Sequence, residues 1–127
     1  MIIPNSNALN NQLDDSVLTK AFFRAGEILA FSRKELARIL GISEASLSRL
    51  ARRQSMLSPE ARDGEIALAF LRIFRSLDAL LGGREADMRL WFDSPHRYLG
   101  MPPRERVKSL EGLFDVVTYL DAMRGQV

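Results

Sequence analysis

Apolar residues recur every three or four positions along most of this 127-residue chain, a spacing that places them on one face of an α-helix. Alternation of apolar and polar residues, which is typical of a strand, never persists long enough to form a sheet. The pattern therefore predicts an all-α fold. The expected helices cover Asp14 or Asp15 to Phe31, two short segments within 32–53, Ser58 to Leu81, Arg84 to Phe92, Arg104 to Leu110, and 111–123.

The longest expected helix has the clearest boundaries. Ser58-Pro59-Glu60 combines a capping residue, a proline suited to the first turn and an acid near the positive end of the helix dipole. Gly82-Gly83 ends the helix. Its apolar stripe is wide enough to cover the two short helices and also to meet another chain, and we expect a surplus to join two copies. The alternative is that the core of one chain uses most of the stripe. The surplus residues are Phe70, Phe74 and Leu77.

Residues 32–53, SRKELARILGISEASLSRLARR, carry the most informative signal. Ser32 is a suitable N-cap for a first short helix, and Glu35, three residues later, completes a capping box. Gly41 supplies the left-handed backbone that ends this helix. Ser43 then caps a second helix. The apolar residues of the two helices and of the turn between them face one core; they are Leu36, Ala37, Leu40, Ile42, Leu47 and Leu50.

These positions also satisfy the sterics of two helices that cross at about a right angle. Such helices must touch closely at Ala37, turn sharply at Gly41 and be wedged at Leu47. The segment therefore predicts a helix-turn-helix that binds DNA. The alternative is a small helical hairpin with a solvated basic face.

The outer face of the second helix carries the candidate DNA contacts. Arg49 has the reach to bridge guanine O6 and N7 in the major groove, while Ser46 and Ser48 offer adaptable hydrogen bonds to base edges. Other side chains are better placed for phosphates, where the amino end of a helix adds partial positive charge. These phosphate candidates are Arg33, Ser43, Arg52 and Arg53.

The distribution of charge supports a division of the chain. Residues 32–53 hold six basic and two acidic side chains, whereas residues 84–127 hold seven of each. A basic and a neutral segment indicate nucleic acid at one and protein at the other. We expect a mobile arm over 1–13, a DNA-binding domain over 14–58 and a second helical domain over 59–127. Because one recognition helix reads only a half-site, we also expect a homodimer.

The sequence offers little for catalysis. It has no cysteine and a single histidine, His96, which excludes thiolate chemistry and multi-histidine metal sites. His96 lies in a proline-containing loop and is expected to be a turn or contact residue. Neither a phosphate-binding glycine loop nor a nucleophile elbow is present. We expect no enzyme activity and no cofactor and, since no signal peptide or membrane-spanning run is found, a soluble cytoplasmic protein.

The carboxy-terminal half contains a second pattern. A Trp with an apolar neighbour, a short loop with proline, Leu-Gly, a further proline and Glu-Gly precede the last helix; here these are Trp91-Phe92, Pro95, Leu99-Gly100, Pro102-Pro103 and Glu111-Gly112. The first half adds Leu40-Gly41-Ile42-Ser43, Leu47-Ser48-Arg49 and Leu57-Ser58-Pro59-Glu60. With these motifs, about residues 30–123 resemble the Xre/MbcA/ParS-like antitoxins of bacterial type II toxin–antitoxin modules. Two positions depart from the pattern, because His96 replaces a common Asn and Met101 a second glycine.

The resemblance implies a toxin as partner, commonly of the RES-domain type that consumes NAD. It also implies that the carboxy-terminal domain covers the toxin's active site and that a dimeric complex represses its own operon. The loop from Pro95 to Pro103 and the helix from Glu111 to Met123 would form the toxin-neutralising surface, with Trp91 and Phe114 in the core. The expected toxin contacts are Tyr98, Tyr119, Met123 and Arg124.

Two other functions fit the same residues. A plain dimeric transcriptional regulator would use its second domain only to oligomerise or to sense a small ligand. A protein adaptor would have lost DNA binding. A toxin-like reading frame beside the gene would favour the antitoxin, and a DNA-binding assay would exclude the adaptor.

Overall fold

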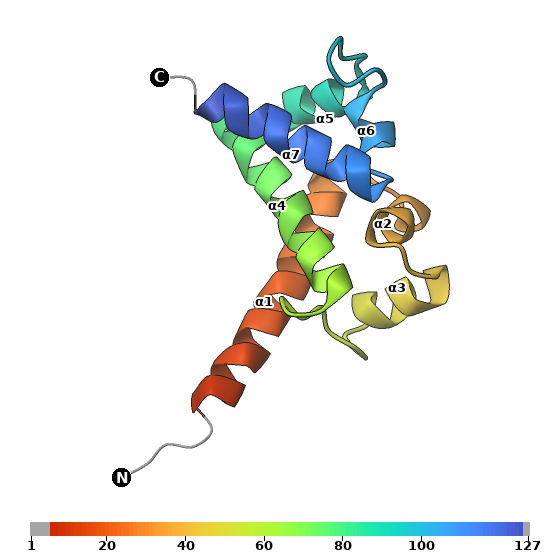
Figure 1. Ribbon diagram of the computed structural model, residues 1–127. Helices are drawn as coiled ribbons and strands as arrows, with labels where there is room; N and C mark the ends of the chain where they lie inside the picture. The colour runs from red at the N-terminus through yellow and green to blue at the C-terminus, as the bar shows by residue number, and fades with distance from the viewer. Residues whose placement is uncertain (1–5, 126–127) are drawn as a thin grey trace.

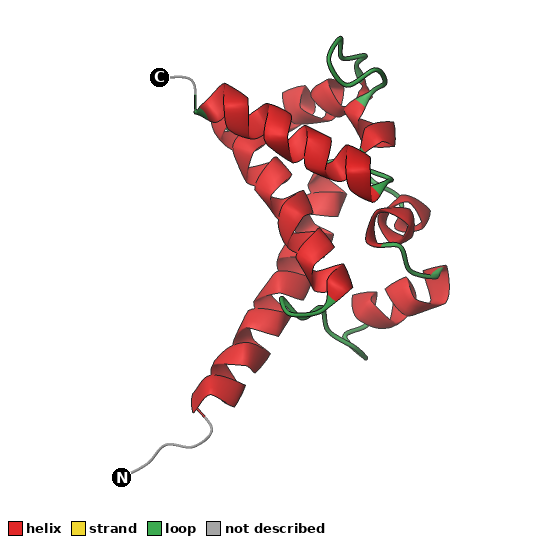
Figure 2. Cartoon of the chain, in the orientation of Figure 1, coloured by secondary structure: helices red, strands yellow, loops and turns green. Residues whose placement is uncertain are grey.

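The computed structural model describes residues 6–125, and within this range every regular element is an α-helix (Figure 2). The all-α prediction is therefore confirmed. The helices are α1 (Ser6–Ile28), α2 (Arg33–Leu40), α3 (Glu44–Ala51), α4 (Arg62–Leu80), α5 (Glu85–Asp93), α6 (Pro103–Arg106) and α7 (Leu110–Arg124). None of the described helices is both long and apolar enough to cross a membrane.

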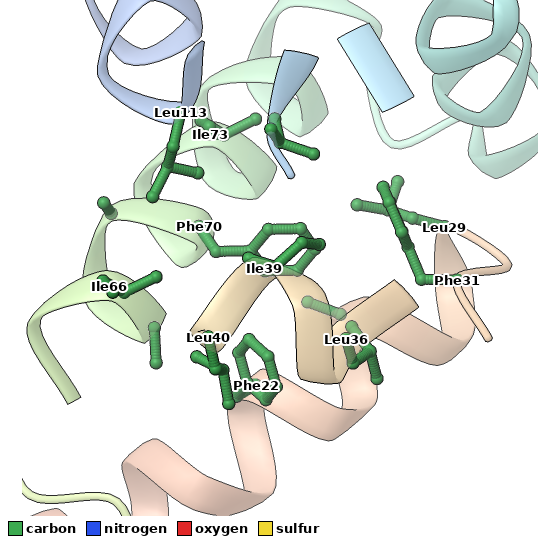
Figure 3. Close-up of a cluster of buried hydrophobic side chains, with 14 of the residues drawn as sticks. Phe22, Leu29, Phe31, Leu36, Ile39, Leu40, Ile66, Phe70, Ile73 and Leu113 are labelled. Carbon is green, nitrogen blue, oxygen red and sulfur yellow. The ribbon is translucent and has the colours of Figure 1, made fainter. Parts of the chain in front are cut away.

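A single hydrophobic core joins the two halves of the chain. Helix α4 lies at its centre, with α1, α2, α5 and α7 packed against it (Figure 1). The ring of Phe70 is fully buried, and it meets Phe22 and Phe31 edge-on with ring centroids 5.4 and 5.5 Å apart (Figure 3). Phe31 in turn meets Phe92 of α5 at 5.4 Å. The aromatic contacts therefore run from the first helix to the carboxy-terminal half without a break.

The first helix begins eight residues before the expected cap at Asp14, because residues 6–13 continue it. The composition of residues 1–13 predicts a mobile arm instead, and residues 1–5 of that arm lie outside the described range. Extending an existing helix costs far less than starting one, so a polar stretch readily prolongs it. The helix ends at Ile28 and not at Phe31 because Ala30 has a left-handed backbone with φ 60°.

The expected start of the long fourth helix is wrong. Helix α4 begins at Arg62, and Ser58 does not cap it. Instead, the carbonyl oxygen of Ser58 accepts the N–H of Ala61, and the hydroxyl of Ser58 donates to Glu60. A turn therefore occupies the positions where the sequence predicts the first helical turn. The predicted end is confirmed within one residue, since Gly82 and the glycine after it have positive φ.

The surface expected on α4 is also corrected. Phe70 is fully buried and Leu77 is 1% exposed, while Phe74 is half-buried against the same core. They are core residues because α1, α2 and α7 together cover more of α4 than one packing face. The outward apolar side chain of this helix is Leu68, which is 45% exposed, together with Leu80 at its end.

The last two helices differ in length from those that the sequence predicts. Helix α6 makes only one turn, because Ser109 caps α7 with its hydroxyl oxygen, which accepts the N–H of Gly112 at 3.1 Å. The expected helix from Arg104 to Leu110 therefore breaks before that cap. Helix α7 then packs along α4, with Leu113 and Leu120 buried between them.

Candidate nucleic-acid interface and partner surface

The α2–α3 motif forms as the sequence predicts. The backbone N–H of Ser32 donates to Oε1 of Glu35 at 2.9 Å, and the N–H of Glu35 donates to Oγ of Ser32 at 3.1 Å. This is the capping box at the start of α2. Gly41 follows the helix with φ 69° and donates to the carbonyl of Arg38 at 3.2 Å. Both ends of the first motif helix are therefore set by local chemistry.

The second motif helix is fixed in the same manner. Ser43 caps α3, since its hydroxyl oxygen accepts the N–H of Ser46 at 3.0 Å. Leu47 and Leu50 point into the core, and Ile42 is half-buried at the corner between the two helices. Helix α3 packs on α2, and α2 packs on α4 (Figure 1). The geometry of a helix-turn-helix is therefore in place, with α3 as the recognition helix.

A row of hydrogen bonds organises the outer side of α3. The hydroxyl of Ser43 donates to Oγ of Ser46 at 3.0 Å, and Nη2 of Arg49 donates to the same oxygen at 2.9 Å. Arg49 is exposed, while Ser48 is half-buried. The row Ser43–Ser46–Arg49 therefore holds the guanidinium group in one orientation before any ligand arrives.

The candidate phosphate contacts fall into two groups. Arg33 and Arg52 are exposed at the ends of α2 and α3. Arg53 instead turns back on its own helix, where its Nη1 donates to the carbonyl of Leu50 at 3.0 Å and its guanidinium lies 5.4 Å from the ring centroid of Phe23. Its backbone has φ 60°. Arg53 therefore ends α3, a structural role that the sequence did not indicate.

An aromatic cluster forms where the loop between α5 and α6, residues 94–102, meets its neighbours. His96 and Tyr98 come from the loop, Trp91 from α5 and Tyr119 from α7. His96 lies between Trp91 and Tyr119, with ring centroids 4.6 and 5.6 Å away, and Tyr98 lies 6.3 Å from Tyr119. Burial lowers the pKa of His96 below its ordinary value, so the ring is neutral at pH 7. Tyr98 is 81% exposed. The sequence selects the two tyrosines and predicts a turn or contact role for His96, but it does not predict that His96 packs between Trp91 and Tyr119.

The four expected toxin contacts do not form one patch. Tyr98 and Tyr119 lie together, and Met123 is one turn further along α7 with about half of its surface exposed. Arg124 faces α4 instead, where its Nη1 donates to Oγ of Ser76 at 3.2 Å.

The core placement expected for two aromatic residues holds only in part. Trp91 is half-buried, whereas Phe114 is 49% exposed beside Leu68 of α4. The buried stripe of α7 runs through Leu113, Val116 and Leu120, and the helical rotation places residue 114 outside it.

Within residues 6–125, no group of three or more histidine, aspartate or glutamate side chains is arranged to hold a metal ion. The charged groups that do gather are ion pairs. The largest group joins Glu35 of α2 to Arg104 and Lys108 in and after α6.

A helix-turn-helix with an organised recognition helix, followed by a helical domain with an exposed aromatic loop, defines a two-part protein of the DNA-binding regulator class. The antitoxin Xre-like helix-turn-helix domain model matches residues 8–72, and the antitoxin Xre/MbcA/ParS C-terminal toxin-binding domain model matches residues 76–125. The chain belongs to this antitoxin family. No curated protein matches the chain. The first model reaches into α4, whereas the sequence predicts that the second domain begins at residue 59.

Proposed function

We propose that the chain is the antitoxin of a type II toxin–antitoxin module, which neutralises its toxin by direct contact and represses its own operon. The adjacent matches to a helix-turn-helix antitoxin domain and to a toxin-binding domain carry this proposal. Its action is binding and not catalysis. The partner is a toxin of the RES type that consumes NAD, as the family resemblance implies.

DNA recognition centres on α3. Arg49 reads a guanine in the major groove, and Ser46 and Ser48 contact neighbouring base edges. The exposed Arg33 and Arg52 bind phosphates on either side, with the amino end of α3 at Ser43 adding partial positive charge. Arg53 contributes its charge to this surface while it stays bonded to the end of α3.

Toxin recognition uses the loop 94–102 and the neighbouring part of α7. Tyr98 is an exposed aromatic ring next to Tyr119, and tyrosines of this kind are common anchors of protein interfaces. Met123 extends the contact along α7, and Arg124 lies at its border. Residues 84–127, which include this surface, have no net charge, in keeping with a segment that buries against protein.

The operator-binding form is a homodimer. The apolar side chains available for the contact are Val17, which is 65% exposed on α1, and Leu68 on α4, with the half-buried Leu71 between them in one hollow. An inverted repeat in the operator would then present one half-site to each recognition helix.

Selection from a pool of random-sequence duplexes tests the DNA-binding half of the proposal. We expect the wild-type chain to enrich an inverted repeat. Arg49→Ala should weaken binding to that duplex by about 1–3 kcal/mol and relax discrimination at one base pair. Glu27→Gln on α1 is the matched control, because it also removes one exposed charge, and it should enrich the same repeat. Binding of all duplexes with equal affinity would contradict the proposal.

A further inference from the structure

We propose that Arg104 and Lys108, two side chains of the toxin-binding domain, position the DNA-recognition motif by holding Glu35 at the amino end of α2. These three residues are called the clasp below. The inference rests on the proposed function, since DNA is the ligand that reports on the motif. It adds positioning residues that lie outside the motif and outside the domain that carries it.

Arg104 connects three segments, two in the first half of the chain and one at the end of α5. Its Nη1 lies 3.3 Å from Oε1 of Glu35, and its Nη2 donates to the carbonyl of Leu29 at 2.9 Å. Its Nε donates to Oδ1 of Asp93 at 2.5 Å, and its guanidinium lies 4.3 Å from the ring centroid of Phe31. The side chain is only 16% exposed. One arginine therefore contacts the end of α1, the start of α2 and the end of α5.

Lys108 completes the clasp from the segment between α6 and α7. Its Nζ lies 3.0 Å from Oε2 of Glu35 and 2.7 Å from Oε2 of Glu105, and its side chain is 11% exposed. Partly buried charges attract one another more strongly than fully exposed charges do, and removing one partner leaves the others less well compensated. The clasp is therefore more than an exposed ion pair.

Glu35 has two functions at the same time. Its Oε1 accepts the N–H of Ser32 in the capping box and also faces Arg104. Burial by itself would raise the pKa of Glu35, but the bonds from Ser32 and Lys108 and the nearby charge of Arg104 bring it below the ordinary value. The carboxylate is thus charged at neutral pH. The carboxylate that caps the start of the recognition motif is therefore also held by side chains of the other domain.

The clasp lies between the two proposed binding surfaces. Arg104 stands two residues after the loop 94–102, which carries Tyr98, and α3 rests on the helix that Glu35 caps. In Figure 1 the loop lies at the top and α3 lies below it on the right side, with α6 and α2 between them. If a partner bound to the loop shifts α6, the clasp contacts to α2 change as well. Coupling between two binding sites is reciprocal, so DNA bound to α3 then changes the affinity of the loop for its partner by the same factor.

Hydrogen exchange of the free full-length chain tests the clasp without any ligand. Arg104→Gln should accelerate exchange several-fold in α2 and α3 while leaving the centre of α4 unchanged, and Arg104→Lys, which keeps the charge, should restore part of the protection. Glu27→Gln, which alters an exposed pair with Arg24, is the control and should change nothing. Equal acceleration in all helices, or none in α2 and α3, would overturn the proposal.

DNA-binding specificity distinguishes positioning from stabilisation, because residues that only stabilise the fold would not change the preference between two duplexes. Gln is acceptable in a capping box, so Glu35→Gln keeps the cap and removes the ion pairs. We expect it to lower the preference for the selected duplex over a scrambled duplex by at least about fivefold, with an unchanged salt slope because the clasp touches no phosphate. An unchanged preference would refute positioning. If the wild type binds no duplex, the proposed DNA function fails, and the exchange measurement still decides on the clasp.

Discussion

The carbonyl oxygen of Ser58 lies directly over the α-carbon of Gly64, so that a Cβ at residue 64 would be 1.6 Å from it. The turn before α4 therefore packs its backbone against the first turn of that helix. The same arrangement recurs before α7, where a Cβ at Gly112 would be 1.9 Å from the carbonyl oxygen of Arg106. The first turns of α4 and α7 are thus in direct contact with the backbone of the preceding turn, and only glycine leaves room for that contact.

Replacing Gly64 with alanine should lower the free energy of unfolding by about 2–3 kcal/mol, because the turn at Ser58 has to move to admit the new Cβ. Gly41→Ala provides a graded comparison. A Cβ at residue 41 meets no atom within 4 Å, and only the left-handed backbone opposes it, at about 1–2 kcal/mol. Urea unfolding of both variants measures the difference. A Gly64→Ala variant as stable as the wild type would contradict the packing described.

Truncation of two apolar residues of α4 should affect different properties, folding stability for one and dimer formation for the other. Phe70→Ala removes the fully buried ring at the centre of the core and should cost about 3–5 kcal/mol of stability. Leu68→Ala should change stability by less than about 1 kcal/mol, because the side chain is 45% exposed, but it should weaken the proposed dimer. Thermal unfolding and light scattering across a concentration series measure the two effects. An intact dimer in Leu68→Ala would place the dimer contact elsewhere.

Arg52 and Arg53 should differ although they are neighbours in sequence. Arg53→Ala removes the bond to the carbonyl of Leu50 and should destabilise the chain by about 1 kcal/mol. Arg52→Ala should leave stability unchanged and reduce the salt dependence of DNA binding, as expected for the loss of one phosphate contact. Unfolding curves and titrations at several salt concentrations separate the two effects. Equal results for the pair would reject this assignment.

The clasp predicts a specific pH dependence. The folded-state pKa of Glu35 is lowered, so its contribution to stability is complete above the ordinary value of 4.5 and is lost as the pH falls through the lower folded value. Glu35→Gln lacks this contribution. The stability difference between wild type and Glu35→Gln should therefore be constant near neutral pH and shrink below pH 4.5, as denaturant unfolding at each pH would show. A difference that grows in acid would contradict the clasp.

The sequence predicts the features that depend on neighbours along the chain. The capping box at Ser32, the left-handed Gly41 and the cap at Ser43 are all confirmed, because each is a contact over three or four residues or the preference of one backbone. The predicted start of α4 is wrong because it, too, relies on neighbours along the chain alone. The pattern at Ser58 suits a helix locally, but the turn is stabilised by packing against Gly64, which the local pattern does not reveal.

The partner surface was predictable only in part. Tyrosines are recognisable by type as common interface residues, and the exposed Tyr98 and the half-buried Tyr119 do lie together. The place of Phe114 outside the core depends on how α7 rotates against α4, which the apolar pattern alone leaves open. The clasp joins Glu35 to Arg104 across 69 positions, and no sequence spacing announces such a contact.

Growth of cells that co-express the chain with the product of a toxin-like reading frame next to its gene tests the central claim most directly. The wild-type chain should restore growth, and Arg49→Ala should restore it equally when expressed from a foreign promoter, because DNA contact is not needed for neutralisation. The double variant Tyr98→Ala, Tyr119→Ala should lose protection while remaining folded. Point variants are preferable to deletion of α7, since deletion removes Leu113 and Leu120 from the core. Failure of the wild-type chain to restore growth would contradict the account.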